Sequence, residues 1–234
     1  MPRANRHRIC GHVWHITHRC HKQEFLLKFF RDRRRWIHWL YEAKKRFGLC
    51  VLNYCVTSNH IHLLVKDTGN ETIPRSMQMV AGRVAQEYNA RKNRRGALWE
   101  DRYHATAVEA DSHLMRCLVY IDLNMVRAGA VHHPSEWPHC GYNEIQNPRI
   151  RYRLIDHAAL LELSGLSEYH QFSDVDRAWV GDRLRDPCRL RESCWTQSVV
   201  VGSKSFVADM KKELGIGFRS RTVTQEQGGV FSLR

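Results

Sequence analysis

The 234-residue sequence lacks the segments that would insert it into a membrane or send it across one. No apolar run approaches the roughly 20 residues that a membrane-spanning helix needs. The first residues, Met1–Arg8, are basic, but no apolar segment of signal-peptide length follows them. These absences predict a cytoplasmic protein without a membrane anchor.

The sequence also lacks a C-x-x-C pair, although it contains eight cysteines. Without such a pair, neither a zinc ribbon nor a thioredoxin-like redox motif is indicated. In a cytoplasmic protein, the thiols are expected to be reduced and mostly buried.

Acidic residues are scarce relative to basic ones. The chain has 24 Asp and Glu against 37 Lys and Arg, a net charge of +13. This excess favours a polyanionic partner and salt-sensitive binding. Charge alone distinguishes neither DNA from RNA nor a nucleic-acid-binding protein from one that is merely basic.

Hydrophobic periodicity predicts alternating strands and helices up to about residue 145. The expected strands cover 12–18, 50–56, 60–66 and 102–109, and the expected helices cover 25–47, 73–93 and 112–128. The order β-α-β-β-α-β-α matches the ferredoxin-like split β-α-β plan of the α+β class, with one antiparallel sheet covered on one face. The rest of the chain forms a C-terminal extension that is expected to be mainly helical.

The expected helix over 25–47 has an apolar stripe and a basic face. The stripe consists of Phe25, Phe29, Trp36, Leu40 and Phe47. Arg34 and Arg35 belong to the basic face, which could follow a phosphate backbone. A solvated helix surface explains such charge runs equally well.

His60 and His62 stand two positions apart in the expected strand over 60–66. Side chains alternate along a strand, so the two imidazoles project to the same side and can hold one metal ion. The spacing is a weak signal by itself, because 15 histidines can produce it by chance. Two ordinary sheet histidines are therefore the alternative interpretation.

Tyr120 lies on a polar stripe of the expected helix over 112–128. A tyrosine needed for packing would be expected among the leucines of the apolar stripe, so this placement favours a chemical role. An exposed tyrosine without a function is the ordinary alternative. Asn124 follows one turn later, so its amide oxygen could complete a metal site with the two histidines while the phenol points at the same ion.

Three segments have the order and spacing of a known family. They are 54–65 (YCVTSNHIHLLV), 98–103 (LWEDRY) and 120–129 (YIDLNMVRAG). Through them, the sequence from about 10 to 145 resembles the single-tyrosine HUH transposases, especially those associated with repetitive extragenic palindromes. The resemblance implies the ferredoxin-like fold already expected, and it is weaker beyond residue 145.

The resemblance also implies roles for the candidate residues. His60 and His62 would be metal ligands, Tyr120 the nucleophile, and Asn124 the third ligand where relatives commonly have the longer Gln. Bound Mg²⁺ or Mn²⁺ would polarise the phosphodiester while the tyrosine attacks phosphorus, giving a 5′-phosphotyrosine and a free 3′-OH. A second 3′-OH could then rejoin strands without ATP. Because imidazole must be neutral to bind a metal, activity is expected to fall below roughly pH 6.5.

The implied organisation is a catalytic domain over 1–145 and a DNA-contacting extension over 146–234. The substrate would be single-stranded DNA carrying hairpins or palindromic repeats, cleaved and rejoined by a transposase or nickase that is a monomer or a homodimer. The residues expected to contact DNA are Arg34, Arg35, Arg94, Arg95, Arg102, Arg116 and Arg127.

Several residues have competing interpretations. Tyr88 is a rival nucleophile beside a basic cluster, although its place on an apolar helical stripe favours packing. Trp99 and Tyr103 could stack unpaired bases or belong to the core. The spacings of four N-terminal histidines suit neither one strand face nor a zinc motif; these are His12, His15, His18 and His21.

Two other functions remain open. One is a non-catalytic module that binds single strands or hairpins, against which the intact set of His60, His62 and Tyr120 argues. The other is a protein that binds or cleaves RNA, because basic charge does not distinguish the two sugars.

Overall fold

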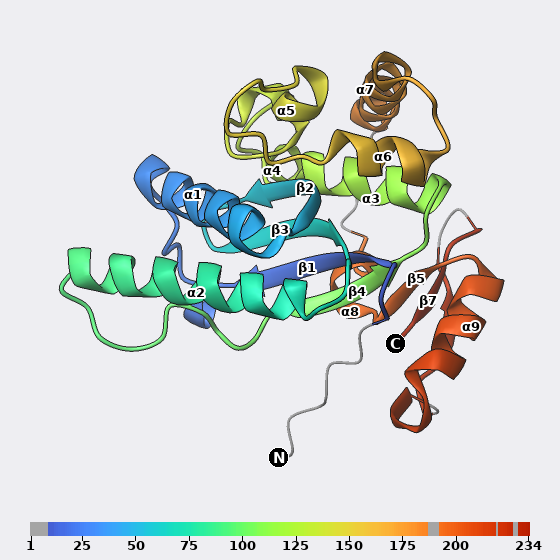
Figure 1. The fold of residues 1–234 in the computed structure, drawn as a ribbon, viewed down its shortest axis with the longest axis horizontal. Coiled ribbons are helices and arrows are strands. Elements are labelled where there is room, and N and C mark those ends of the chain that lie inside the picture. The colour runs from blue at the N-terminus through green and yellow to red at the C-terminus, as the bar shows by residue number, and fades with distance from the viewer. Residues whose placement is uncertain (1–8, 187–191, 219, 227–228) are drawn as a thin grey trace.

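The computed structural model describes residues 9–186, 192–218, 220–226 and 229–234. Within these residues, seven strands form one sheet in the order β2-β3-β1-β4-β5-β7-β6 (Figure 1). Neighbours among the first four are antiparallel, and their order confirms the ferredoxin-like α+β plan. These strands are β1 (Val13–Arg19), β2 (Cys50–Val56), β3 (His60–Lys66) and β4 (His104–Val108).

Helices cover both faces of this four-stranded part, whereas the sequence predicted one covered face. Helices α1 (Phe30–Phe47) and α2 (Thr72–Arg91) pack against each other on one face. Helix α3 (Ser112–Asp122) contacts β2 and β4 from the other. Because side chains alternate along β1 and β3, every second residue of these strands points toward α3.

Helix α1 begins at Phe30, five residues later than predicted. Lys22 and Gln23 have positive φ angles of 51° and 58°, which turn the chain sharply after β1. The following segment is held by its backbone: the Leu27 N–H donates to the Ser58 carbonyl at 2.8 Å. The predicted apolar stripe is therefore wrong for Phe25 and Phe29, which lie outside the helix and are exposed.

The third predicted helix is interrupted near its end. Helix α3 stops at Asp122, and the short α4 (Asn124–Arg127) follows after Leu123, whose ψ angle is 4°. Gly129 then takes a positive φ of 67°, as expected for a residue that terminates a helix. The interruption falls between Tyr120 and Asn124, so the two residues belong to different helical segments.

The C-terminal extension contributes strands as well as helices. Strand β5 pairs with β4 in parallel, so the sheet as a whole is mixed rather than antiparallel. The sequence did not predict these strands because runs of three residues show no measurable period. The extension contains α6 (His157–Ser164), α7 (Tyr169–Arg185), α8 (Cys194–Gln197), α9 (Lys204–Leu214), β5 (Val200–Gly202), β6 (Val223–Gln225) and β7 (Phe231–Leu233), and α5 (Tyr142–Gln146) precedes it.

The seven cysteines in the described part of the chain are free thiols, and all but Cys10 are buried, as predicted. Cys188 lies outside the described residues. None of the helices described is long and apolar enough to cross a membrane.

Two buried carboxyl groups lie between the sheet and α7. Asn53 donates to Asp122 at 2.9 Å, and Gln146 donates to Asp176 at 2.8 Å. Burial raises the pKa of Asp122, and it raises that of Asp176 to about 7. Helix α7 packs against α3, the helix that carries Tyr120, and so helps to hold α3 in place.

We expect Asp176→Asn to stabilise the protein at pH 8 and to flatten the pH dependence of its stability. The pKa of Asp176 is higher in the folded protein than in the unfolded chain. Its contribution to the free energy of unfolding is therefore most favourable below about pH 4 and is lost as the pH rises through about 7. The gain at pH 8 should be on the order of 1–4 kcal/mol. Urea unfolding at pH 5 and pH 8 measures it.

Asp174→Asn is the matched control, because Asp174 lies on the same helix with a side chain that is 64% exposed. It should change stability little at either pH. The raised pKa of Asp176 would be contradicted if, between pH 5 and pH 8, the free energy of unfolding of the wild type fell no more steeply than that of Asp176→Asn.

Candidate active site

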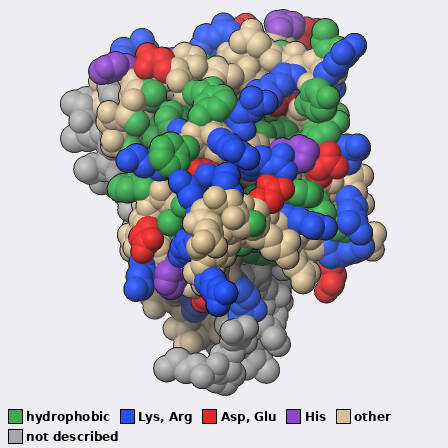
Figure 2. Space-filling view, turned by 90° about the vertical axis from the view of Figure 1, so that its left-hand side faces the viewer, with side chains coloured by type: hydrophobic (Ala, Val, Ile, Leu, Met, Phe, Trp, Pro, Cys, Tyr) green, Lys and Arg blue, Asp and Glu red, His purple; other side chains and the backbone are tan. Residues whose placement is uncertain are grey.

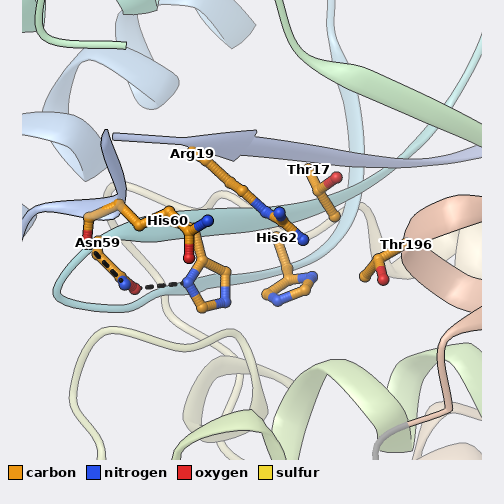
Figure 3. A pocket seen from close by; sticks show the side chains of 7 residues that line it. Thr17, Arg19, Asn59, His60, His62 and Thr196 are labelled. Atoms are coloured by element: carbon orange, nitrogen blue, oxygen red, sulfur yellow. Dashed lines mark hydrogen bonds between the residues drawn. The ribbon is translucent and has the colours of Figure 1, made fainter. Parts of the chain in front are cut away.

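A small pocket of about 110 Å³ opens at the end of the sheet where β1 finishes and β3 begins. Figure 3 shows both histidines of β3 side by side in it. The β1 residues Thr17 and Arg19 flank them, and Thr196 of α8 approaches from the extension. The remaining lining residues are Gln23 and Asn59.

Hydrogen bonds fix the orientation of the His60 ring. The amide nitrogen of Asn59 donates to the Gln23 carbonyl at 3.2 Å, which directs the Asn59 carbonyl oxygen toward His60. That oxygen accepts from His60 Nδ1 at 2.7 Å. Because Nδ1 carries the proton, the lone pair of the neutral ring is on Nε2, the arrangement that metal-binding histidines use.

His62 is oriented by a second histidine. His15 Nδ1 lies 2.8 Å from the Trp195 carbonyl, which only accepts, so Nδ1 carries the proton. Burial lowers the pKa of His15 to about 3, so its ring is neutral and Nε2 is an acceptor. His15 Nε2 lies 2.9 Å from His62 Nδ1, which must therefore donate. Both β3 histidines thus have the lone pair on Nε2.

Tyr120 of α3 packs directly against these rings. Its ring centre lies 5.8 Å from that of His62 and 6.1 Å from that of His15, in both cases nearly perpendicular. Trp195 covers it from the extension at 6.1 Å. The Arg127 guanidinium lies over the ring at 4.3 Å. The stripe that carries Tyr120 therefore faces the histidines rather than solvent, and the side chain is only 4% exposed.

Asn124 reaches the same place from the first turn of α4. Its Nδ2 atom is placed 2.8 Å from His62 Nε2, so the amide donates to the lone pair that a metal would use. Rotating the amide by half a turn would present its oxygen instead. No group of three His, Cys, Asp or Glu in the described chain could hold a metal ion; here the Asn124 amide would give the two imidazoles a third protein ligand. Two imidazole nitrogens and an amide oxygen form a mixed donor set that suits a divalent metal ion.

Tyr88 lies away from this site. It belongs to α2, on the opposite face of the sheet from Tyr120, and is partly buried against the core. The Arg91 guanidinium lies 5.3 Å from its ring centre. These contacts support the packing interpretation.

The arginines predicted to contact DNA do not form one surface. Arg35 forms two hydrogen bonds with Glu87, at 2.7 and 2.6 Å, and Arg127 packs on Tyr120 and donates to its carbonyl. DNA contact by these seven residues stays a prediction. The exposed members are Arg34, Arg95 and Arg102, and the half-buried members are Arg94 and Arg116.

Trp99 and Tyr103 belong to the fold rather than to an open surface. The Trp99 ring stacks on His18 with centres 4.2 Å apart, and its indole N–H donates to the Ala81 carbonyl at 3.0 Å. Tyr103 is buried at 8% exposure.

The sequence patterns gave His15 no role at the site and did not indicate the residues of α8. His15 alternates with Trp14 and Ile16 on β1, so pairing β1 with β3 would have placed it on the same face as His62. Trp195 and Thr196 gave no such signal, because their position depends on how the extension folds back.

A protein-family model described as "Transposase IS200 like" matches residues 10–124, which span the four-stranded sheet, the two histidines and Tyr120. This segment belongs to the IS200-like transposase family. A search of curated proteins gives no match.

Two solved structures resemble this chain. One is described as a REP-associated tyrosine transposase bound to a REP hairpin; it is 17% identical, with a TM-score of 0.49, over 68% of this chain and 96% of that one. The other is a crystal structure of a Deinococcus radiodurans R1 protein; it is 16% identical, with a TM-score of 0.36, over 54% of this chain and 91% of that one. The family assignment rests on the sequence match.

Proposed function

We propose that this protein is a metal-dependent transposase that cleaves and rejoins single-stranded DNA at hairpin-associated sites through Tyr120. One observation carries the proposal: a tyrosine, two histidines with their lone pairs on Nε2 and an amide converge from three separate elements. A merely structural cluster would not need both imidazoles fixed in the same tautomer. The proposed catalytic domain is 1–145.

His60, His62 and Asn124 would hold the metal. When bound, a hard divalent ion polarises the phosphodiester and stabilises charge on the departing oxygen. Asn59 and His15 act on the ligands by fixing which nitrogen carries the proton. His15 is thus a positioning residue, and the Trp195 carbonyl that orients it belongs to the extension.

Tyr120 would form the covalent bond. Its phenolic oxygen bonds to phosphorus, the bond from phosphorus to the 3′ oxygen breaks, and the proton that the phenol loses is balanced by the one that the 3′ oxygen gains. The product is a 5′-phosphotyrosine, which a second 3′-OH can attack to rejoin strands without ATP. The Tyr120 side chain is only 4% exposed, and the Trp195 ring centre lies 6.1 Å from its own, so the extension packs beside the proposed nucleophile.

The proposal of hairpin DNA as substrate follows the resemblance carried by segments 54–65, 98–103 and 120–129. The net charge of +13 suits a polyanionic substrate. Such an enzyme would act in the cytoplasm, at the nucleoid, as a monomer or a homodimer. The extension over 146–234 would complete the site and contact DNA.

Incubating the full chain and Mn²⁺ with a single-stranded hairpin DNA, labelled at its 3′ end, tests the proposal. We expect a labelled species that migrates with the protein on a denaturing gel, because the 5′ end of the downstream fragment stays attached to tyrosine. EDTA should prevent its formation, and an RNA hairpin of the same sequence should give none. Binding without any covalent species would favour the non-catalytic alternative.

A further inference from the structure

Three phenylalanines between β1 and α1 are exposed. Phe25, Phe29 and Phe30 expose 66%, 55% and 52% of their surface, whereas Leu26 and Leu27 between them are buried. The leucines thus anchor the segment in the core while the rings face solvent. Only six large hydrophobic side chains of the described chain are exposed, and these three lie within six residues of one another. Such a concentration is typical of a binding surface.

The segment is fastened to the rim of the candidate site. The Leu27 N–H donates to the Ser58 carbonyl at 2.8 Å, and the Asn59 amide donates to the Gln23 carbonyl at 3.2 Å. Ser58 and Asn59 directly precede His60, and both Gln23 and Asn59 line the pocket. The three rings therefore stand beside the entrance to the pocket.

A buried arginine makes this placement rigid. Arg33 donates to the carbonyls of Leu27 and Lys28 at 3.0 and 2.8 Å, and to the Ser58 hydroxyl at 3.4 Å. Its guanidinium also lies over the Trp137 ring at 4.7 Å. Because one side chain ties the segment to the turn before His60, the backbone that carries the rings is held beside that turn.

Cations surround the exposed rings. The Lys92 ammonium lies 5.0 Å from the centre of the Phe29 ring, and the Arg34 guanidinium lies 5.7 Å from that of Phe30. Figure 2, which faces this end of the molecule, shows hydrophobic side chains interleaved with Lys and Arg. The other exposed cations of segments 22–34 and 91–95 are Lys22, Lys28, Arg31, Arg91 and Arg95.

Aromatic rings interleaved with cations fit single-stranded nucleic acid better than other partners. Unpaired bases offer flat apolar faces for stacking, and their phosphates pair with the cations. The bases of a duplex are already stacked on each other and offer no such face. A purely apolar protein partner would leave this many charges unpaired.

We infer that Phe25, Phe29 and Phe30, the phenylalanine platform, stack unpaired bases of the DNA strand whose phosphate enters the pocket. The choice of DNA rests on the proposed function, whereas stacking rests on the rings themselves. The platform would hold the strand next to Tyr120 without reading its sequence, since every base has a stacking face.

Binding of a labelled single strand to the full-length Tyr120→Phe protein in EDTA isolates recognition from cleavage. We expect the added double change Phe25→Leu and Phe29→Leu to weaken binding by about 10- to 100-fold, because leucine keeps apolar surface but loses the flat ring. The salt dependence of binding should stay the same, because no cation is removed. Tyr152→Leu is the matched control: its ring is 70% exposed outside the platform, so affinity should not change.

A change in the DNA tests stacking directly. Replacing unpaired bases near the cleavage site with abasic positions should weaken binding to the parent protein but hardly affect the double variant, since the two changes remove the same contact. An equal loss with both proteins would overturn the proposal, as would unchanged affinity of the double variant. If the double variant does not fold, the single change Phe25→Leu, at the most exposed ring, replaces it. This variant should show a smaller loss of affinity in the same comparison of intact and abasic DNA.

Failure of the platform and failure of the proposed function give different results. If the wild type forms the covalent species but the double variant binds as tightly as its parent, the platform is wrong and the enzyme stands. If no covalent species forms but abasic positions weaken binding to the parent more than to the double variant, the platform stands and the proposed enzymatic function is wrong. If the double variant loses only self-association, measured by sedimentation, the surface is an interface between copies and the proposal is wrong.

Discussion

Replacing Tyr120 with Phe should abolish the covalent DNA species and lower the cleavage rate at least about a thousandfold, because the attacking oxygen is lost. The ring itself is retained, so its packing against His62, His15 and Trp195 should survive. Fold and Mn²⁺ affinity are expected to stay near the wild-type values. Gel analysis of the labelled hairpin measures the loss of cleavage, a melting curve measures the fold, and calorimetric titration measures the Mn²⁺ affinity.

Tyr88→Phe is the matched control for this substitution. It also removes one phenolic oxygen, but from the opposite face of the sheet. Its cleavage rate should equal that of the wild type. If Tyr88→Phe loses the covalent species while Tyr120→Phe retains it, the nucleophile has been assigned to the wrong helix.

Replacing His62 with Ala should eliminate Mn²⁺ binding, and with it cleavage, because one of two imidazole ligands is removed. His15→Phe should weaken Mn²⁺ binding by about 10- to 100-fold without removing a ligand, since His62 Nδ1 loses its acceptor. His15→Gln offers an amide oxygen in its place and should recover part of the affinity. Calorimetric titration with Mn²⁺ measures these differences independently of activity.

Varying the Mn²⁺ concentration distinguishes the role of His62 as a ligand from the role of His15 as a positioning residue. Raising it should restore cleavage in His15→Phe, where the site is weakened, but not in His62→Ala, where a ligand is missing. If His15→Phe binds Mn²⁺ as tightly as the wild type and still cleaves poorly, His15 does not act through His62.

The strongly periodic segments allowed most of the four-stranded core to be predicted. Strands β2 and β3 have the predicted bounds, since each is a seven-residue run separated by a short turn. The start of α1 was wrong because Phe25 and Phe29 continue a helical spacing by coincidence, while the turn at Lys22 and the bond to Ser58 decide their conformation. Local periodicity does not include such contacts between segments.

The candidate site was predictable only as far as alternation and helical spacing reach. They placed His60 with His62 and Tyr120 near Asn124, and the structure brings all four together. The dependence of His62 on His15 requires the pairing of β1 with β3, and the dependence of His15 on the Trp195 carbonyl requires the fold of the extension. Neither is encoded in a local pattern.

Mapping the DNA-linked residue by mass spectrometry tests the central claim most directly. Wild-type protein would be trapped on the hairpin with Mn²⁺, digested with nuclease and protease, and searched for the tyrosine that retains a 5′ nucleotide. We expect this residue to be Tyr120. A nucleotide on Tyr88 or on any other residue would contradict it.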